Sequence, residues 1–151
     1  MLRLKGQKTP NDCAVACLQN ALALRGRRVG RRRIIDALGG DLSLGIDAPD
    51  IKRALDIFGQ PYTECSTSEP AVARGWLQRH AAAGPVIAAT RDWEHWELIA
   101  GVCGDRLAVH DPETGIYWAS LRWFMREWPA RATTPRRVGV PGAGRHCAVA
   151  I

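Results

Sequence analysis

A cysteine directly after two helix-capping residues is the first feature of this 151-residue sequence that points to chemistry. Asn11 and Asp12 are residue types that cap helices, so a helix is expected to begin near Cys13. The unpaired backbone N–H groups and the dipole of a helix N-terminus favour an anion, which stabilises a cysteine placed there as its thiolate. Cys13 is therefore a candidate nucleophile, and it would need a base and a group that orients the base.

A base and an orienting group are both available on two consecutive predicted strands. The run "HWELIAGV" alternates, with an apolar face that extends from Trp96 to Val102 and with His95 and Glu97 on the other face. The following run, "RLAVHD", ends at Asp111 and leads into the turn "PETG". The Asp111 carboxylate is therefore expected at the end of the strand that pairs with the strand of His95.

The hairpin between these two runs decides whether the side chains meet. A three-residue loop over 103–105 would set Asp111 opposite Glu97 and diagonal to His95, with all three on one face. A two-residue loop would set Asp111 opposite Leu98 and would send His95 to the other face. The catalytic interpretation therefore requires the longer loop or a bulge.

The elements around these residues predict an α+β fold in which helices precede strands. Helices are expected from Cys13 to about Gly26, around Ile34 to Leu38, from Asp47 to Gly59 and from about Glu69 to Ala83. Short strands are expected over 85–90, 95–102, 106–111 and 116–120, as an antiparallel meander closed by a last helix, "LRWFMREW". The helix of Cys13 should be central, and residues 129–151 should form a basic loop or tail.

Composition and cysteine count limit what the chain can be. A single domain over 1–151 is expected, with 46% hydrophobic and 24% charged residues and no apolar run long enough to cross a membrane. The N-terminus has no secretory signal, and the five cysteines are an odd number, so reduced thiols in the cytoplasm are expected. No metal-ligand spacing occurs, so neither a metal nor another cofactor is expected.

The net charge of +6 comes mostly from arginine, with a cluster in Arg25–Arg33. Such a run can attract nucleic acid, anionic lipid or an acidic peptide, but the favoured interpretation is a solvated connection between two helices. No aromatic residue is interleaved with the run and no nucleic-acid motif accompanies it, so nucleic acid is not an expected partner. Binding of an anionic surface through this run is the weaker alternative.

Four residues taken together resemble a known arrangement. Gln7 stands upstream of "DC" at Cys13, and "HW" at His95 is followed by "DPETG" at Asp111. This order and spacing resembles the bacteriocin-processing, double-glycine leader peptidases of the papain-like cysteine protease superfamily. The likeness extends over about residues 5–128, through "WLQRHAAAGPVIAAT" before the histidine and "FMREW" near the end.

The resemblance implies a papain-like fold, in which N-terminal helices, with the nucleophile at a helix N-terminus, pack on a C-terminal antiparallel sheet. It implies Cys13 as the nucleophile that forms a thioester, His95 as the general base and then acid, and Asp111 as the residue that orients the imidazole. Gln7 is implied as a donor to the oxyanion, together with the backbone N–H of Cys13. Asp12 is interpreted as a helix cap. The implied activity is hydrolysis of a peptide bond in a peptide or protein.

Other functions remain open beside a leader peptidase. A papain-like amidase acting on cell-wall peptide, or a deamidase of protein glutamine, would use the same thiol acyl-transfer chemistry. A papain-like domain that binds a peptide without cutting it belongs to a different class, and the complete set of Cys13, His95 and Asp111 argues against it. Cys17, one helical turn after Cys13, is interpreted as a small core residue.

Overall fold

A computed structural model describes residues 3–43, 45–91, 94–129 and 145–151. In chain order its elements are α1 (Cys13–Leu24), α2 (Arg31–Ala37), α3 (Ala48–Ile57), β1 (Thr63–Thr67), α4 (Pro70–Ala83), β2 (Val86–Thr90), β3 (His95–Cys103), β4 (Arg106–Asp111), β5 (Gly115–Ser120), α5 (Leu121–Glu127) and β6 (His146–Ala150). The α+β class, the expected helices and the antiparallel meander of β2 to β5 are confirmed. No helix in these ranges is both long enough and apolar enough to span a membrane.

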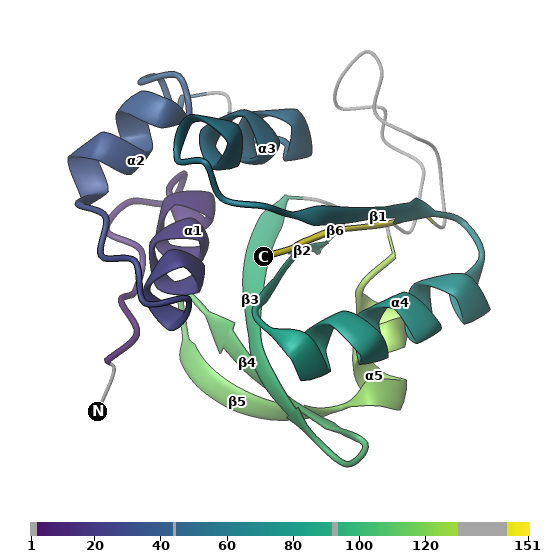
Figure 1. Ribbon diagram of the computed structural model, residues 1–151. Helices are drawn as coiled ribbons and strands as arrows, with labels where there is room; N and C mark the ends of the chain where they lie inside the picture. The colour runs from purple at the N-terminus through teal and green to yellow at the C-terminus, as the bar shows by residue number, and fades with distance from the viewer. Residues whose placement is uncertain (1–2, 44, 92–93, 130–144) are drawn as a thin grey trace.

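One antiparallel sheet separates two layers of helices. Its strands run in the order β1-β6-β2-β3-β4-β5. Helices α1, α2 and α3 pack with one core cluster on one face of the sheet, and α4 and α5 pack with a second cluster on the other face (Figure 1). Strand β2 lies between the layers and is buried along its whole length, which is why its sequence, "VIAAT", has no polar alternation.

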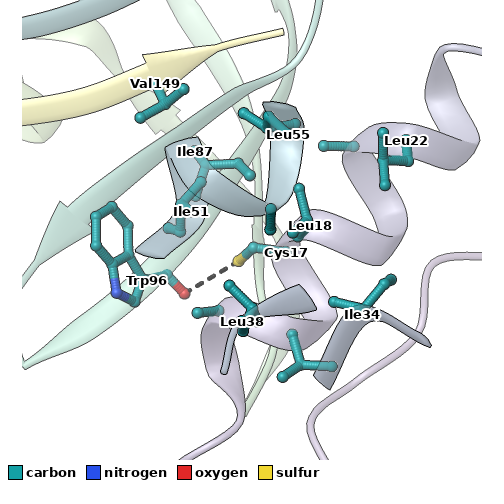
Figure 2. Close-up of a cluster of buried hydrophobic side chains, with 14 of the residues drawn as sticks. Cys17, Leu18, Leu22, Ile34, Leu38, Ile51, Leu55, Ile87, Trp96 and Val149 are labelled. Carbon is teal, nitrogen blue, oxygen red and sulfur yellow. Dashed lines mark hydrogen bonds between the residues drawn. The ribbon is translucent and has the colours of Figure 1, made fainter. Parts of the chain in front are cut away.

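Helix α1 is the centre of the first layer, as expected. All ten residues from Cys13 to Leu22 are buried, which is the pattern of a core helix rather than of a surface helix. Cys17 is fully buried among aliphatic side chains of α1, α2 and α3, and its thiol donates a hydrogen bond to the Trp96 carbonyl at 3.2 Å (Figure 2). The interpretation of Cys17 as a core residue is confirmed.

The hairpin between β3 and β4 combines a two-residue loop with a bulge. Cys103 pairs with Arg106, so the loop has two residues, beginning with Gly104 at φ +59°. A β-bulge at Ala100 then restores the offset that a three-residue loop would have given. Of the two solutions that the sequence allowed, a longer loop or a bulge, the structure has the bulge, which keeps His95 on the required face.

The bulge also changes which face the C-terminal half of β3 presents. Trp96 and Leu98 belong to the cluster around α1, as expected, but Val102 packs against the opposite cluster, which contains Ile99. The expected single apolar face from Trp96 to Val102 is therefore wrong beyond Ala100, because one extra residue shifts the alternation of side chains by one.

Two strands, β1 and β6, have no counterpart among the sequence predictions. Strand β6 lies between β1 and β2, and its residues Ala148 and Val149 are fully buried. The expected loop or tail over 129–151 is therefore wrong for residues 146–150. The short run "HCAVA" is rich in alanine and carries a weak strand signal, and it becomes a strand only through partners distant in sequence. Residues 130–144 of the expected tail lie outside the described residues.

Val149 tests the buried position of β6. Val149→Ala removes two methyl groups from a fully buried site in the cluster around α1, so the free energy of unfolding should fall by about 2 kcal/mol. Ile116→Ala, at a side chain of β5 that is 64% exposed, should change it by less than about 0.5 kcal/mol. Urea denaturation followed by circular dichroism measures both values, and an equally small change in the two variants would contradict this placement.

Candidate active site

Cys13, His95 and Asp111 lie far apart in the chain and meet at the N-terminal end of α1. Cys13 is the first residue of α1, His95 is the first residue of β3, and Asp111 is the last residue of β4. All three side chains are buried, with exposed fractions of 6%, 6% and 1% in the same order. A pair of neighbouring strands thus supplies the imidazole and the carboxylate, and the central helix supplies the thiol.

The His95 imidazole is held between a carboxylate and a thiol. Its Nε2 lies 2.8 Å from Asp111 Oδ1, and the Cys13 thiol at the N-terminus of α1 interacts electrostatically with the ring. Burial alone lowers the pKa of His95, but the hydrogen bonds and the negative charge of Cys13 and Asp111 outweigh burial and raise the pKa above 6.5. A raised histidine pKa favours the imidazolium, which is the partner that a cysteine thiolate requires.

The Asp111 carboxylate accepts hydrogen bonds from four groups. They are His95 Nε2, the Glu113 backbone N–H at 2.8 Å, the Thr114 hydroxyl at 2.9 Å and Arg91 Nη2 at 2.6 Å. Burial alone would raise the pKa of Asp111, but the hydrogen bonds from Glu113, His95 and Thr114 lower it. Two of the donors come from the turn that follows, "DPET", because an aspartate readily binds backbone and hydroxyl groups two and three residues ahead.

Arg91 reaches the same carboxylate from the end of β2. Its guanidinium binds Asp111 at 2.6 Å and Glu113 at 2.9 Å, and its backbone has a φ of +50°, which is uncommon for a residue other than glycine. Sequence reasoning missed Arg91, because nothing in the run "ATRD" separates it from an ordinary solvated arginine. Only the connection from β2 to β3 brings it to Asp111.

Glu97 is a further buried carboxyl beside this group. One ligand-type atom from each of His95, Glu97 and Asp111 lies within 4.8 Å of the others, and Glu97 accepts a hydrogen bond from the Tyr117 hydroxyl at 3.0 Å. Histidine and carboxylates also bind metal ions, but here His95 and Asp111 are hydrogen-bonded to each other and Asp111 has three further donors. In this arrangement the Asp111 carboxylate is the main acceptor of a hydrogen-bonded network.

The segment before α1 carries Gln7 to the turn that follows Asp111. The Gln7 backbone N–H donates to the Pro112 carbonyl at 2.8 Å. Two hydrogen bonds, of 2.9 and 2.8 Å, join the Lys5 backbone to the Asn20 side chain of α1 and hold the segment in place. The side-chain oxygen of Gln7 is buried and has no hydrogen-bond partner among the described residues. The structure therefore fixes the Gln7 backbone beside the Asp111 turn without using its amide oxygen.

Asp12 holds this same segment rather than capping the helix. It occupies the N-cap position of α1, but its side chain makes no capping hydrogen bond. Its fully buried carboxylate accepts the backbone N–H groups of Lys8, at 3.0 and 3.2 Å, and of Thr9, at 3.1 Å, and it pairs with Arg31 of α2. The expected side-chain cap is wrong, because the backbone at Asp12 (φ −114°, ψ 22°) departs from the extended conformation of a capping residue.

Several arginines of the run Arg25–Arg33 bind other parts of this chain. Arg25 binds the Ile151 carbonyl, Arg27 binds the Phe58 carbonyl, Arg31 pairs with Asp12 and Arg32 pairs with Asp36. The side chains of this run therefore link the end of α1 to the residues that follow α3 and β6, and link α2 to the residue before α1. The expectation that nucleic acid is not a partner stays a prediction.

The fold is that of a papain-like cysteine peptidase. The sequence profile of the Peptidase C39 family matches residues 3–136, and the chain belongs to this family. This assignment confirms the resemblance to bacteriocin-processing peptidases that the sequence indicated.

Individual relatives agree with the family assignment. The chain is 25% identical over 142 residues to the lactococcin-G-processing and transport ATP-binding protein LagD of Lactococcus lactis subsp. lactis, and the match covers 90% of this chain but 19% of LagD. The peptidase domain of Streptococcus ComA, a bi-functional ABC transporter involved in quorum sensing, has the same fold, with a TM-score of 0.68, 17% identity and coverage of 99% of this chain and 98% of that domain. A double-glycine motif protease from an AMS/PCAT transporter, in complex with the leader peptide, gives a TM-score of 0.70 at 16% identity, covering 98% of this chain and 89% of that protein.

The ion pair between Arg31 and Asp12 can be tested for its contribution to stability. Arg31→Met leaves the Asp12 carboxylate buried without its cation, so the free energy of unfolding should fall by about 3 kcal/mol. The matched control is Arg32→Met on the same helix, which breaks the exposed pair with Asp36 and should cost less than about 1 kcal/mol. Denaturant titration compares the two, and a loss no larger for Arg31→Met than for Arg32→Met would contradict a structural role for the buried pair.

Proposed function

We propose that Cys13, His95, Asp111 and Gln7 form the catalytic site of this cysteine peptidase, and that the site cuts a leader peptide after a double glycine. The observation that carries the proposal is the hydrogen bond between His95 and Asp111, together with the interaction of the same imidazole with the Cys13 thiol at the N-terminus of α1. The substrate class is supported by the relatives, which include a double-glycine motif protease and a lactococcin-G-processing protein.

Peptide hydrolysis would proceed in two acyl-transfer steps. The Cys13 thiolate attacks the scissile carbonyl carbon, and His95, as the imidazolium, gives its proton to the departing amine, which leaves a thioester on Cys13. A water molecule then attacks the thioester while neutral His95 accepts one of its protons. The carboxylic acid product leaves, and its departure returns the sulfur of Cys13 to the thiolate paired with the imidazolium.

Asp111 orients the imidazole in this scheme. Its Oδ1 engages Nε2 of His95, so the other ring nitrogen is the one available for the thiol and the leaving group. The donors from Arg91, Glu113 and Thr114 fix the carboxylate so that it cannot rotate away. A fixed imidazole orientation is the contribution that the third residue of such a site is required to make.

The oxyanion would be stabilised by Gln7 and by the first turn of α1. Cys13 is the first residue of α1, so its backbone N–H has no acceptor inside the helix and is free for a developing negative charge. Gln7 is held beside the Asp111 turn by its own backbone, and the NH₂ group of its side chain would be the donor to the oxyanion. Two donors of this kind suit the tetrahedral intermediate of acyl transfer.

The other functions considered for the sequence gain no support from the relatives. Cell-wall amidase activity, glutamine deamidation and binding without cleavage would retain the same buried residues, but the family and the solved structures are those of peptidases. A reducing, cytoplasmic location is part of the proposal, and it is supported by the five cysteines, all of which are free thiols.

Cleavage of a double-glycine leader peptide tests the site assignment. Cys13→Ala and His95→Ala should each lower turnover by about 10⁴-fold or more, because each removes a partner of one catalytic unit, while circular dichroism shows the fold retained. Cys103→Ala, which removes an exposed thiol of the β3–β4 hairpin, should leave turnover unchanged. The measurement is mass spectrometry of the cleavage products, and turnover that survives Cys13→Ala would rule the assignment out.

The pH dependence of Cys13 alkylation tests the thiolate and imidazolium pair without any substrate. Since the pKa of His95 is raised, the imidazolium should persist above pH 6.5, and Cys13 should react with iodoacetamide at pH values where a free thiol is protonated. In His95→Ala this reaction at low pH should be lost. Peptide mass mapping locates the modified residue, and identical pH profiles in the two proteins would show that no such pair exists.

A further inference from the structure

We propose that Glu97 is a positioning residue of the catalytic site. At low pH Glu97 keeps its proton while Asp111 carries the negative charge. At higher pH, but before His95 loses its proton, Glu97 ionises, and its negative charge then holds His95 as the imidazolium. The proposal rests on the roles proposed above for His95 and Asp111. It gives Glu97 a function that neither the family assignment nor the catalytic series accounts for.

The geometry places two carboxyl groups against one imidazole. Glu97 lies two residues after His95 on the same face of β3, and Asp111 lies on the neighbouring strand. The nearest ligand-type atoms of the three residues all lie within 4.8 Å of one another, and all three side chains are buried. Two carboxylates this close in a buried site repel each other, so one of them retains its proton at pH values where an isolated carboxyl would be ionised.

The surrounding donors decide which carboxyl carries the charge. Asp111 accepts hydrogen bonds from four donors, one of which is the guanidinium of Arg91. Glu97 accepts a hydrogen bond from the neutral Tyr117 hydroxyl, and the Thr90 hydroxyl faces the same carboxyl. Because charged and backbone donors stabilise the ionised form more than neutral hydroxyls do, Asp111 is the anion and Glu97 is the neutral acid.

The remaining charges around Glu97 agree with this division. Its titratable and charged neighbours are His95 on β3, Asp111 on β4, Tyr117 on β5, Arg91 after β2, Glu127 on α5 and the Cys17 thiol of α1. Burial raises the pKa of Glu97 above 4.5, and the charge of Asp111 raises it further, while the bond from Tyr117 and the charge of His95 lower it by less. Burial and the neighbouring Glu97 charge raise the pKa of Tyr117, so this hydroxyl remains a donor.

A cavity gives Glu97 room to exchange its proton. Its volume is about 310 Å³, and Glu97, Asp111, Tyr117 and Trp123 are among the residues that line it. The cavity adjoins α5, on the face of the sheet opposite the Cys13 thiol of α1. Glu97 can therefore exchange its proton with solvent through this cavity.

The proposal is tested by titrating two side chains in the intact chain. Carboxyl ¹³C NMR follows Glu97, assigned by its loss in Glu97→Gln, and imidazole NMR follows His95. We expect Glu97 to titrate above 4.5 and below His95. Glu97→Gln cannot ionise, so it should lower the pKa of His95 by about one unit, a tenfold change in its dissociation constant. The control, Glu64→Gln on the distant edge strand β1, should leave His95 unchanged.

The pH profile of Cys13 alkylation separates a charge effect from structural damage. The reagent is iodoacetate, whose negative charge is attracted by the imidazolium, so its rate falls on the alkaline side as His95 loses its proton. Glu97→Gln imitates the neutral acid, so its rate should equal that of the wild type at low pH and should fall at lower pH than the wild type on the alkaline side. Tyr117→Phe removes a donor and should raise the pKa of Glu97, which supplies a second test should Glu97→Gln fail to fold.

Three results would overturn the proposal: a Glu97 carboxyl that titrates at or below 4.5, a His95 titration unchanged in Glu97→Gln, or an equal loss of alkylation at every pH. These readouts need no substrate. Failure of the proposed function would appear separately, as turnover that survives Cys13→Ala.

Discussion

The pairing of β3 with β4 determines the chemistry of the whole site, because a strand alternates its side chains with a period of two. A shift of one residue would turn His95 away from Asp111 and bury it among the apolar residues of the opposite face. The two-residue hairpin loop alone would produce that shift, and the single extra residue at Ala100 cancels it. The bulge at Ala100 is therefore required for the hydrogen bond between the His95 imidazole and Asp111.

The thiol side of the site depends on a different constraint, which is the position of the first turn of α1. The helix is buried on all sides from Cys13 to Leu22, so packing fixes its axis. The segment before it is fixed by Asp12, which binds Lys8, Thr9 and Arg31, and by the Gln7 bond to Pro112. This last bond joins the entry to α1 with the exit from β4, so the groups around the thiol and the groups around Asp111 are positioned by one connected set of contacts.

Much of this arrangement could be predicted from the sequence, because the decisive signals are local. Capping residues before Cys13, glycine and proline at helix ends, and alternation in β3 and β4 located the helices, the meander and the cysteine, histidine and aspartate. The bulge at Ala100 could be stated only as one of two solutions, since no local pattern distinguishes it. Arg91, β1 and β6 escaped prediction because their positions depend on partners distant in the chain, and Asp12 because an aspartate before a helix is usually a cap.

The position of β6 in the sheet also constrains the order in which the molecule can be assembled. Strand β1 touches the rest of the sheet through β6, whereas β2 to β5 are joined to one another by short connections. The meander and α1 can therefore come together while the chain is still being synthesised, before residues 146–150 have left the ribosome. Strand β1, made much earlier, has no neighbour in the sheet until then. The pairing of His95 with Asp111 thus depends on contacts of low sequence separation within the meander, whereas the docking of α1 with Cys13 and the closure through β6 both depend on slower, long-range contacts.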